Sequence, residues 1–402
     1  MTSPNLAAAP SVAAAPSVAG VPLRVVYLPL DPGAATEVLA GEIQRALDGG
    51  EAIAPVTDPA AAQGLPEVVP ATTAVVLSTS GSSGVPKRTL LSASALRASC
   101  AATSRRLGGD GDWLLCLPAG FVAGFQVIAR AVLGGTTVSA LDGGRFDPAG
   151  FAAAVDGMGS GRRYTSLVPT QVKRLLADPD GRKALARMDR VLVGGAALDR
   201  ATGDRLREIT EVVTTYGMTE TCGGCVYDGV PLDGVRVRIV DGMIHLGGAC
   251  VADGYLGAAP EEAGRFYAAD GVRWYATADR GHFTGGLLVP TGRVDDLINT
   301  GGVKVSATAI EAILAELDWV DTAIVMGVPD PEWGELVSAC LVPRAGGQAA
   351  DPEPLRALIR ERLGRAAVPK RIVVLDDLPL LPNSKIDRRA VRERLLTGPG
   401  KD

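Results

Sequence analysis

The chain has 402 residues, of which 47% are hydrophobic and 21% are charged, and this length accommodates a large domain and a smaller one. The composition is that of a folded globular protein, and the net charge of −5 without a basic block argues against a nucleic-acid partner. No apolar run reaches the roughly 18 residues of a membrane helix, which excludes membrane insertion, and the six scattered cysteines favour a reducing cytoplasm.

The N-terminal segment, residues 1–20, is rich in alanine, proline and serine, and we expect a disordered tail there. A signal peptide is disfavoured because no basic residue precedes the alanines and prolines interrupt the apolar run. The pattern then predicts a strand over 21–30, a helix over 34–47 and a strand over 74–77.

The loop Ser78-Thr-Ser-Gly-Ser-Ser-Gly-Val-Pro-Lys87 follows the strand predicted at 74–77. Its glycines let the backbone approach an anion, its hydroxyls and N–H groups can donate to phosphate oxygens, and Lys87 adds a positive charge. A solvated Ser/Gly linker is the alternative. The position of the loop after an apolar strand favours phosphate binding. It is not a Walker A loop, because Pro86 precedes Lys87 and Arg88 follows it.

Helix and strand patterns alternate through the next part of the chain. They predict helices over 90–107, capped by Ser92, and over 124–133, and strands over 113–117, 164–168, 190–193 and 212–216. This alternation predicts layered α/β sheets. Ligands usually bind at the carboxyl ends of such strands. We therefore expect one shared site that includes the phosphate loop, Gly194-Gly195-Ala196 and Tyr216-Gly217-Met218-Thr219-Glu220.

Arg130 interrupts the apolar helix predicted over 124–133. Its side chain either extends to the surface or meets an anion inside the protein. The residue spacing alone favours a side chain of Arg130 that extends to the surface.

The pattern changes after residue 231. Short β-type runs at 235–240, 243–246 and 273–276 predict a small barrel or antiparallel sheet. Helices over 307–317 and 354–363 and strands over 323–328, 338–342 and 371–375 then predict a compact α+β unit. We predict an N-terminal domain of layered α/β sheets with a small β-barrel-like part over 21–292. A mobile α+β C-terminal domain over 293–402 would follow, hinged near Asp295.

Five stretches require a common explanation, namely 78–87, 216–220, 277–279, 292–295 and 382–387. Tyr216 offers an aromatic face for a base, Thr219 a hydroxyl for a phosphoryl oxygen, and Glu220 a carboxylate for Mg²⁺. Asp279 can accept hydrogen bonds from both hydroxyls of a ribose, and Arg293 can hold ribose or phosphate.

In this order the five stretches resemble the adenylate-forming superfamily of acyl-CoA synthetases, peptide-synthetase adenylation domains and luciferases, over roughly residues 70–395. The resemblance implies ATP, Mg²⁺ and coenzyme A as ligands, and a lysine at position 385 that acts in catalysis with Thr219 and Glu220, the Mg²⁺ ligand. It implies a nucleotide site of Thr79, Ser80, Gly81, Ser82, Ser83, Gly84, Lys87, Gly194, Gly195, Ala196, Tyr216, Gly217, Met218, Thr219, Asp279 and Arg293. The hinge and the loop that guides coenzyme A fall on Asp295, Gly301, Gly302 and Lys304.

Within the superfamily the chain is most similar to the o-succinylbenzoate–CoA ligases of menaquinone biosynthesis, in a short actinobacterial form. The segments 113–118, 166–176 and 274–281 carry this similarity. It implies an aryl dicarboxylate as the acid, contacted by Phe121, Arg130, Ser166, Gly195 and Gly217. The guanidinium of Arg130 would pair with the carboxylate that is not activated, which favours an internal role for this residue.

Two departures from the family pattern affect the expected site. Phe121 stands where relatives usually have a histidine or another aromatic residue, so its ring can gate the acyl pocket without a polar contact. Val303 replaces a frequent Glu or Tyr beside the coenzyme A loop.

Three alternatives stay open at this point: a CoA ligase for another aryl or fatty acid, a free-standing adenylation enzyme that loads a carrier protein, and a nucleotide-binding regulatory protein without catalysis. A homodimer is common in the superfamily.

Overall fold

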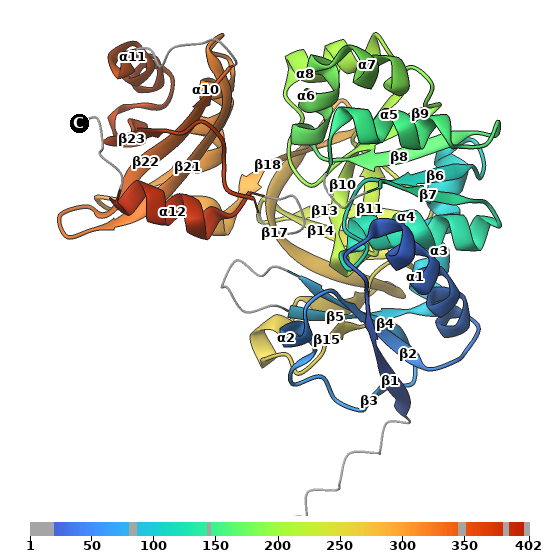
Figure 1. Ribbon diagram of the computed structural model, residues 1–402. Coiled ribbons are helices and arrows are strands. Elements are labelled where there is room, and N and C mark those ends of the chain that lie inside the picture. Colours follow the sequence, from blue (N-terminus) through green and yellow to red (C-terminus); the bar gives the residue numbers. More distant parts are fainter. Residues whose placement is uncertain (1–19, 80–86, 143–145, 345–350, 381–385, 398–402) are drawn as a thin grey trace, which may run out of the picture.

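The computed structural model describes residues 20–79, 87–142, 146–344, 351–380 and 386–397. Most of the predicted tail, the middle of the phosphate loop (Ser80, Gly81, Ser82, Ser83 and Gly84 among its residues) and Lys385 lie outside the described residues. The chain forms a large N-terminal part with three sheets and a smaller C-terminal part with a fourth (Figure 1). The predicted α/β class is confirmed.

The first sheet combines strands from the beginning of the large part's sequence with one strand, β15, from near its end. Its order is β15 (Gly254–Tyr255), β5 (Lys87–Ser92), β4 (Thr73–Thr79), β2 (Ala52–Val56), β1 (Gly20–Tyr27) and β3 (Val68–Pro70). β1, β2 and β4 run parallel, whereas β5 returns antiparallel to β4. The sheet therefore presents both ends of the predicted phosphate loop, at Thr79 and Lys87, side by side.

The second sheet is parallel at its centre. Its order is β12 (Val230–Pro231), β11 (Gly223–Tyr227), β10 (Val212–Met218), β9 (Arg190–Val193), β8 (Arg163–Leu167), β6 (Asp112–Leu115) and β7 (Val138–Ala140). The parallel register pairs Leu167 with Val193 and Val193 with Thr214, so the carboxyl ends of β8, β9 and β10 share one edge. The predicted strands over 164–168, 190–193 and 212–216 fall on these three.

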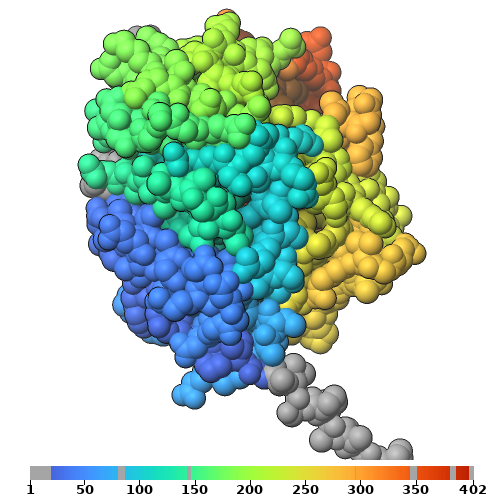
Figure 2. All heavy atoms as spheres, turned by 90° about the vertical axis from the view of Figure 1, so that its right-hand side faces the viewer, coloured from blue at the N-terminus to red at the C-terminus, as the bar shows by residue number. Residues whose placement is uncertain are grey.

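Helices pack on both faces of the second sheet. One core fills the space between the two sheets and includes buried side chains of α1 (Pro32–Leu47), α3 (Ala93–Leu107) and α4 (Val122–Gly134). A second core covers the other face with α5 (Pro148–Asp156), α6 (Pro169–Ala177), α7 (Pro179–Leu185) and α8 (Arg200–Arg207). Figure 2 shows the blue segments of the first layer and the green segments of the second meeting in one continuous surface.

The third sheet is antiparallel and completes the large part. It contains β13 (Val235–Val240), β14 (Met243–Gly248), β17 (Val272–Thr284), β16 (Phe266–Ala269) and β18 (Leu287–Arg293). The short helix α9 (Pro260–Ala263) connects β15 to β16, and another short helix, α2 (Pro59–Ala62), connects β2 to β3 of the first sheet. The predicted strand over 273–276 is far shorter than β17, because pairing with β18 extends β17 beyond its apolar segment.

The C-terminal part begins after the short helix η2 (Val294–Asp296). Its sheet has the order β20 (Val303–Ser306), β19 (Leu297–Thr300), β22 (Gly334–Pro343) and β21 (Val320–Asp330), with β23 (Arg371–Val374) beside β22. The helices are α10 (Ala307–Ala315), α11 (Pro352–Leu363), η3 (Arg365–Ala367) and α12 (Arg388–Thr397). This α+β arrangement is the one predicted from the sequence.

One predicted helix starts too early. The expected helix over 90–107 begins at Ala93, because Leu90 and Leu91 belong to β5, which pairs with β4 and β15. Ser92 is the N-cap, as predicted, and its hydroxyl accepts a hydrogen bond from the backbone N–H of Ala95 at 3.3 Å. Among the described residues, no helix has the length and apolar character needed to span a membrane.

Candidate active site

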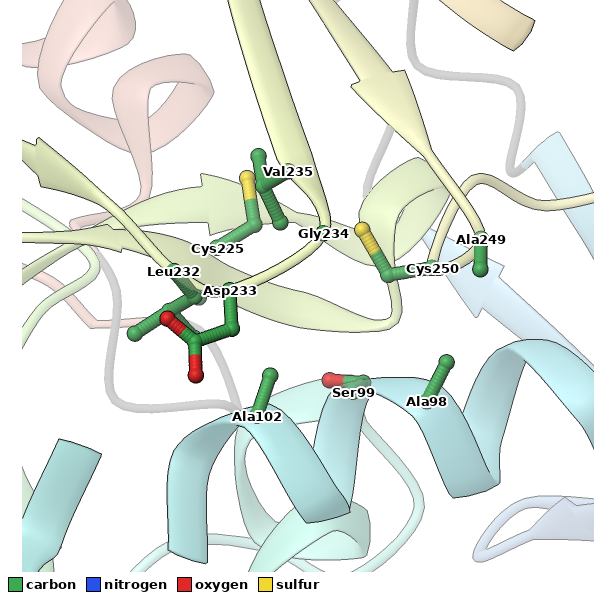
Figure 3. Close-up of a pocket in the computed structure, with 11 residues that line it drawn as sticks. Ala98, Ser99, Ala102, Cys225, Leu232, Asp233, Gly234, Val235, Ala249 and Cys250 are labelled. Carbon is green, nitrogen blue, oxygen red and sulfur yellow. The ribbon is translucent and has the colours of Figure 1, made fainter. Parts of the chain in front are cut away.

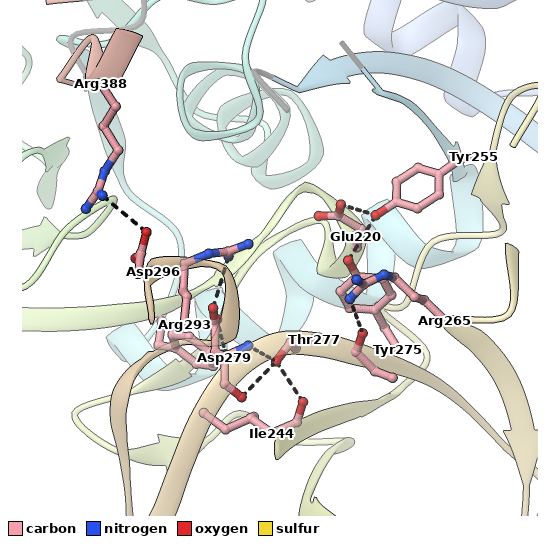
Figure 4. Close-up of polar contacts among 12 residues, drawn as sticks. Glu220, Ile244, Tyr255, Arg265, Tyr275, Thr277, Asp279, Arg293, Asp296 and Arg388 are labelled. Carbon is pink, nitrogen blue, oxygen red and sulfur yellow. Dashed lines mark hydrogen bonds and ion pairs between the residues drawn. The ribbon is translucent and has the colours of Figure 1, made fainter. Parts of the chain in front are cut away.

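Three of the predicted nucleotide-binding residues meet where β10, β17 and β18 converge. The Tyr216 hydroxyl donates to Asp279 Oδ2 at 2.6 Å. Arg293 Nη1 donates to Asp279 Oδ1 at 3.0 Å (Figure 4). Burial and the neighbouring Asp279 charge raise the pKa of Tyr216, so its hydroxyl remains a donor at neutral pH. This cluster can hold a polar group such as a ribose against the Tyr216 ring.

The position of Asp279 is fixed by the strand pairing around it. β17 and β18 pair Asp279 with Arg293 directly. The backbone N–H of Asp279 donates to the Thr277 hydroxyl oxygen at 2.9 Å, and the Thr277 hydroxyl donates to the carbonyl of Ile244 at 2.8 Å. The carboxylate is therefore held by backbone geometry rather than by side-chain contacts alone.

A close approach of β10 and β11 shapes the turn that carries Thr219 and Glu220. The register shifts between Tyr216 and Gly217, and a Cβ added at Gly217 would lie 2.2 Å from the carbonyl oxygen of Gly223. Only glycine fits this approach. After Met218 the chain enters the short helix η1 (Thr219–Thr221), which buries Thr219 and Glu220 at 8% exposure each.

Glu220 is the candidate Mg²⁺ ligand. Its Oε1 accepts a hydrogen bond from the Tyr255 hydroxyl at 2.5 Å, and Oε2 has no hydrogen-bond partner within the described part of the chain. Mg²⁺ in nucleotide sites usually binds one or two carboxylates together with waters and phosphates. A single carboxylate with one oxygen available fits that ion.

The two ends of the predicted phosphate loop are held together by β4 and β5. Thr79 pairs with Lys87 across the hairpin, and its hydroxyl donates to the Lys87 carbonyl at 3.4 Å. Lys87 Nζ forms an ion pair with Glu262 at 2.6 Å and lies 5.4 Å from the centroid of the Tyr255 ring. The predicted lysine therefore lies beside the residue that contacts Glu220.

Further predicted residues lie at the carboxyl edge of the second sheet. Gly194 follows β9, donates its N–H to the Leu167 carbonyl at 3.1 Å, and approaches Thr215 so closely that a Cβ would lie 2.3 Å from its Oγ1. Ser166 is in β8, and Gly195 and Ala196 continue the loop after β9. Phe121 is the N-cap of α4, in the turn after β6. The structure thus places Gly194, Gly195 and Ala196 after the carboxyl end of β9, as predicted, while the roles of Ser166 and Phe121 in an acyl pocket remain predictions.

Arg130 lies apart from this edge. It is 8% exposed, so the surface position favoured by spacing is wrong. Its Nη2 donates to the Tyr227 hydroxyl at 3.3 Å and its Cζ lies 5.1 Å from the Trp113 ring, while its buried Nε has no partner among the described residues. Trp113 is near the amino end of β6. The structure does not bring Arg130 to the carboxyl edge with Ser166 and Gly195.

The predicted coenzyme A loop is a hairpin in the C-terminal part. Gly301 and Gly302, with φ of 57° and 81°, form the turn between β19 and β20, and Lys304 is exposed on β20. The Gly301 N–H donates to the carbonyl of Trp333 at 2.8 Å. Asp295 lies in η2, between the two parts of the chain, and the predicted catalytic Lys385 lies outside the described residues.

Sequence reasoning missed Tyr255, Tyr275 and Glu262. The Tyr255 hydroxyl reaches Glu220 and the Glu262 carboxylate reaches Lys87 because β15 joins the first sheet and α9 lies next to it. Tyr275, on β17, contacts the Tyr255 hydroxyl. No local pattern around Gly254-Tyr255 indicates a pairing with β5, which is more than 160 residues earlier in the chain. The signal was therefore absent from the sequence.

A small cavity beside the site does not hold the substrates. It lies between α3 and the strands β11 and β13, is lined by Ser99, Cys225 and Cys250 among others, and measures about 30 Å³ (Figure 3). Ligand pockets for small molecules usually measure roughly 300 Å³ or more. This cavity accommodates little more than a water molecule.

The family is decided by two matches along the chain. The AMP-binding enzyme family matches residues 12–256, and its C-terminal domain matches residues 309–385. The chain belongs to the AMP-binding enzyme family. The superfamily resemblance found in the sequence is thereby confirmed, and the chain is an AMP-forming acid–thiol ligase by family.

Two relatives of this AMP-binding enzyme carry the same name. A probable 2-succinylbenzoate–CoA ligase of Mycobacterium tuberculosis strain H37Rv is 38% identical over 384 residues, which cover 92% of this chain and 98% of that protein. The 2-succinylbenzoate–CoA ligase of Salmonella typhimurium is 30% identical over 327 residues, covering 78% of this chain and 67% of that protein.

Solved structures of this family have the same fold. ATP-bound MatB from Rhodopseudomonas palustris matches with a TM-score of 0.69 and 26% identity, covering 80% of this chain and 68% of that one. The o-succinylbenzoate CoA synthetase MenE from Bacillus subtilis, in complex with the acyl-adenylate intermediate OSB-AMP, matches with a TM-score of 0.68 and 23% identity, covering 89% and 81%. At that identity the second match supports the fold alone.

Proposed function

We propose that this AMP-binding enzyme joins 2-succinylbenzoate to coenzyme A, with ATP converted to AMP and pyrophosphate, as a step in menaquinone biosynthesis in the cytoplasm. The observation that carries the proposal is the 38% identity that extends over 98% of the Mycobacterium tuberculosis relative. The cluster of Tyr216, Asp279 and Arg293 beside Glu220 supports a nucleotide site at the carboxyl edge.

The first proposed step forms an acyl-adenylate. A carboxylate oxygen of the acid attacks the α-phosphorus of ATP, and the bond to the bridging oxygen breaks to release pyrophosphate. The Tyr216 ring stacks on the adenine, Asp279 accepts the ribose hydroxyls, and Thr219 donates to the α-phosphate. Lys87 and the loop hydroxyls hold the leaving phosphates. Glu220 would hold Mg²⁺, which neutralises phosphate charge when bound.

The second proposed step transfers the acyl group. The coenzyme A sulfur attacks the adenylate carbonyl carbon, the bond to the phosphate oxygen breaks, and the thiol proton leaves to solvent as AMP departs. Rotation about the hinge at Asp295 would withdraw Lys385 after the first step and bring the turn at Gly301-Gly302 and Lys304 to the thiol.

A coupled assay tests the substrate. We expect AMP formation that requires 2-succinylbenzoate and coenzyme A together, with little AMP from benzoate or a medium-chain fatty acid. A faster rate with another acid would overturn the substrate. Acid-dependent pyrophosphate release without any use of coenzyme A would instead favour an adenylation enzyme that serves a carrier protein.

The role of Lys385 is tested in separate half-reactions. Lys385→Ala is expected to reduce adenylate formation by about a hundredfold or more, because it removes charge stabilisation at the reacting phosphoryl group. The same variant should convert supplied acyl-adenylate and coenzyme A to thioester at nearly the rate of the unmodified enzyme. Equal losses in both half-reactions would contradict this role.

A further inference from the structure

Tyr255 lies between the two charged side chains that the proposed function places around the phosphates. Its hydroxyl donates to Glu220 Oε1 at 2.5 Å (Figure 4). Its ring faces the Lys87 ammonium at 5.4 Å. The residue is 9% exposed. One side chain therefore contacts the candidate metal carboxylate and the last residue of the phosphate loop at the same time.

The orientation of the Tyr255 ring is fixed by its neighbours. The Tyr275 hydroxyl lies 2.9 Å from the Tyr255 oxygen, and it acts as the donor because Tyr255 donates to Glu220. The Phe266 ring packs against Tyr255 at 5.1 Å and against Tyr275 at 4.8 Å between centroids. The Tyr275 hydroxyl thus donates to Tyr255, and the Tyr255 hydroxyl donates to Glu220, so each hydroxyl has an acceptor.

The backbone holds the same three parts together. Tyr255 pairs with Thr89, two residues after Lys87, where β15 adds to the edge of the first sheet. The N–H of Ala252 donates to the carbonyl of Glu220 at 2.9 Å. The segment 252–255 therefore ties the strand that carries Lys87 to the turn that carries Glu220, and Tyr255 repeats this link with its side chain.

We propose that Tyr255 is a positioning residue that couples Lys87, where the phosphate loop ends, to the metal carboxylate. Its hydroxyl occupies Glu220 Oε1 and turns Oε2 toward the metal, while its ring, together with the Glu262 carboxylate 2.6 Å from Lys87 Nζ, holds the lysine. Binding of Mg²⁺ and of the nucleotide phosphates is then arranged by one side chain. This inference rests on the nucleotide site of the proposed function but not on the identity of the acid.

The test measures how tightly the full chain binds Mn²⁺, which is used in place of Mg²⁺, and how tightly it binds ATP. No acid substrate is present. Mn²⁺ binding in the presence of ATP is followed by electron paramagnetic resonance, and metal-free ATP binding by calorimetry. Tyr255→Phe keeps the ring and removes the hydroxyl, so we expect Mn²⁺ binding to weaken about tenfold while metal-free ATP binding is unchanged. Tyr255→Leu also removes the ring, and we expect both affinities to fall.

Two further variants separate positioning from a general loss of structure. Tyr275→Phe leaves the bond between Tyr255 and Glu220 in place, so a weaker effect in the same direction is expected. Tyr267→Phe removes a hydroxyl that contacts Arg238 and His245, away from Glu220, and should change neither affinity.

Unchanged Mn²⁺ binding in Tyr255→Phe would overturn the proposal, and so would an equal loss of Mn²⁺ and metal-free ATP binding. Because no acid is present, failure of 2-succinylbenzoate as a substrate leaves this result intact. The two proposals can therefore fail separately.

Discussion

Glu311 is a partly buried carboxyl beside the hinge. Its Oε1 accepts the backbone N–H of Val325 at 2.8 Å, and Arg388, which also pairs with Asp296, lies 3.8 Å away. Burial raises the pKa of Glu311 from 4.5 to about 7. Because this pKa is higher in the folded state, the folded protein binds the proton more tightly. The resulting stability is complete below pH 4.5 and is lost as the pH rises through about 7.

The substitution Glu311→Gln removes this pH dependence. We expect its free energy of unfolding to exceed that of the unmodified protein by up to about 3 kcal/mol at pH 8 and to differ little at pH 5. Urea unfolding at the two pH values measures the difference, with Glu361→Gln, an exposed position on α11, as the control. The prediction is wrong if Glu311→Gln and the control show the same pH dependence.

Arg130 illustrates how a single residue can carry two interpretations. Recognition of the second carboxylate of the acid remains a prediction, but the contacts with Trp113 and Tyr227 favour a structural role. We expect Arg130→Ala to lower the free energy of unfolding by about 3 kcal/mol, because it leaves a cavity and removes a buried cation–π contact. The KM values for 2-succinylbenzoate and for benzoate should then change by similar factors. A selective loss of the dicarboxylate would restore the recognition role.

The strand pair β10 and β11 determines where Thr219 and Glu220 lie. Gly217→Ala would place a Cβ 2.2 Å from the Gly223 carbonyl, so the strands must separate and move the turn. We expect a loss of activity of at least tenfold and a lower melting temperature, since repacking of this kind costs about 1–3 kcal/mol. Gly41→Ala on α1, whose Cβ would meet only the Arg45 guanidinium at 3.7 Å, is the control. Normal activity in Gly217→Ala would show that the close approach is not required.

Those helix and strand boundaries that depend on local sequence patterns were predicted from the sequence. β9 (Arg190–Val193) has the predicted bounds, and Ser92 caps α3 as expected. The motif residues Tyr216, Asp279 and Arg293 were found because each lies in a short recognisable stretch, and the structure brings them together. The link from β15 to β5 depends on a pairing between distant segments, which periodicity cannot show.

Charged contacts connect the two parts of the molecule. Lys173 on α6 donates to the carbonyl of Asp321 on β21 at 2.5 Å and lies 3.2 Å from its carboxylate. Arg174 lies 3.8 Å from the carboxylate of Asp377. Charged pairs of this exposure contribute roughly 0.2–1 kcal/mol each. Such contacts favour one arrangement of the C-terminal part without fixing it, as the proposed rotation between the two steps requires.

Lys173→Ala tests whether these contacts set the balance between arrangements. Loss of roughly 0.6 kcal/mol shifts a two-state population about threefold. We expect a population shift of that size between the two arrangements, measured by single-molecule energy transfer between dyes on the two parts. The rates of adenylate formation and of thioester formation should change in opposite directions. Lys183→Ala, which removes only an exposed pair with Asp180 on α7, is the matched control. If both variants keep the distribution of the unmodified enzyme, the arrangement is set elsewhere, and the hinge around η2 becomes the segment that must determine it.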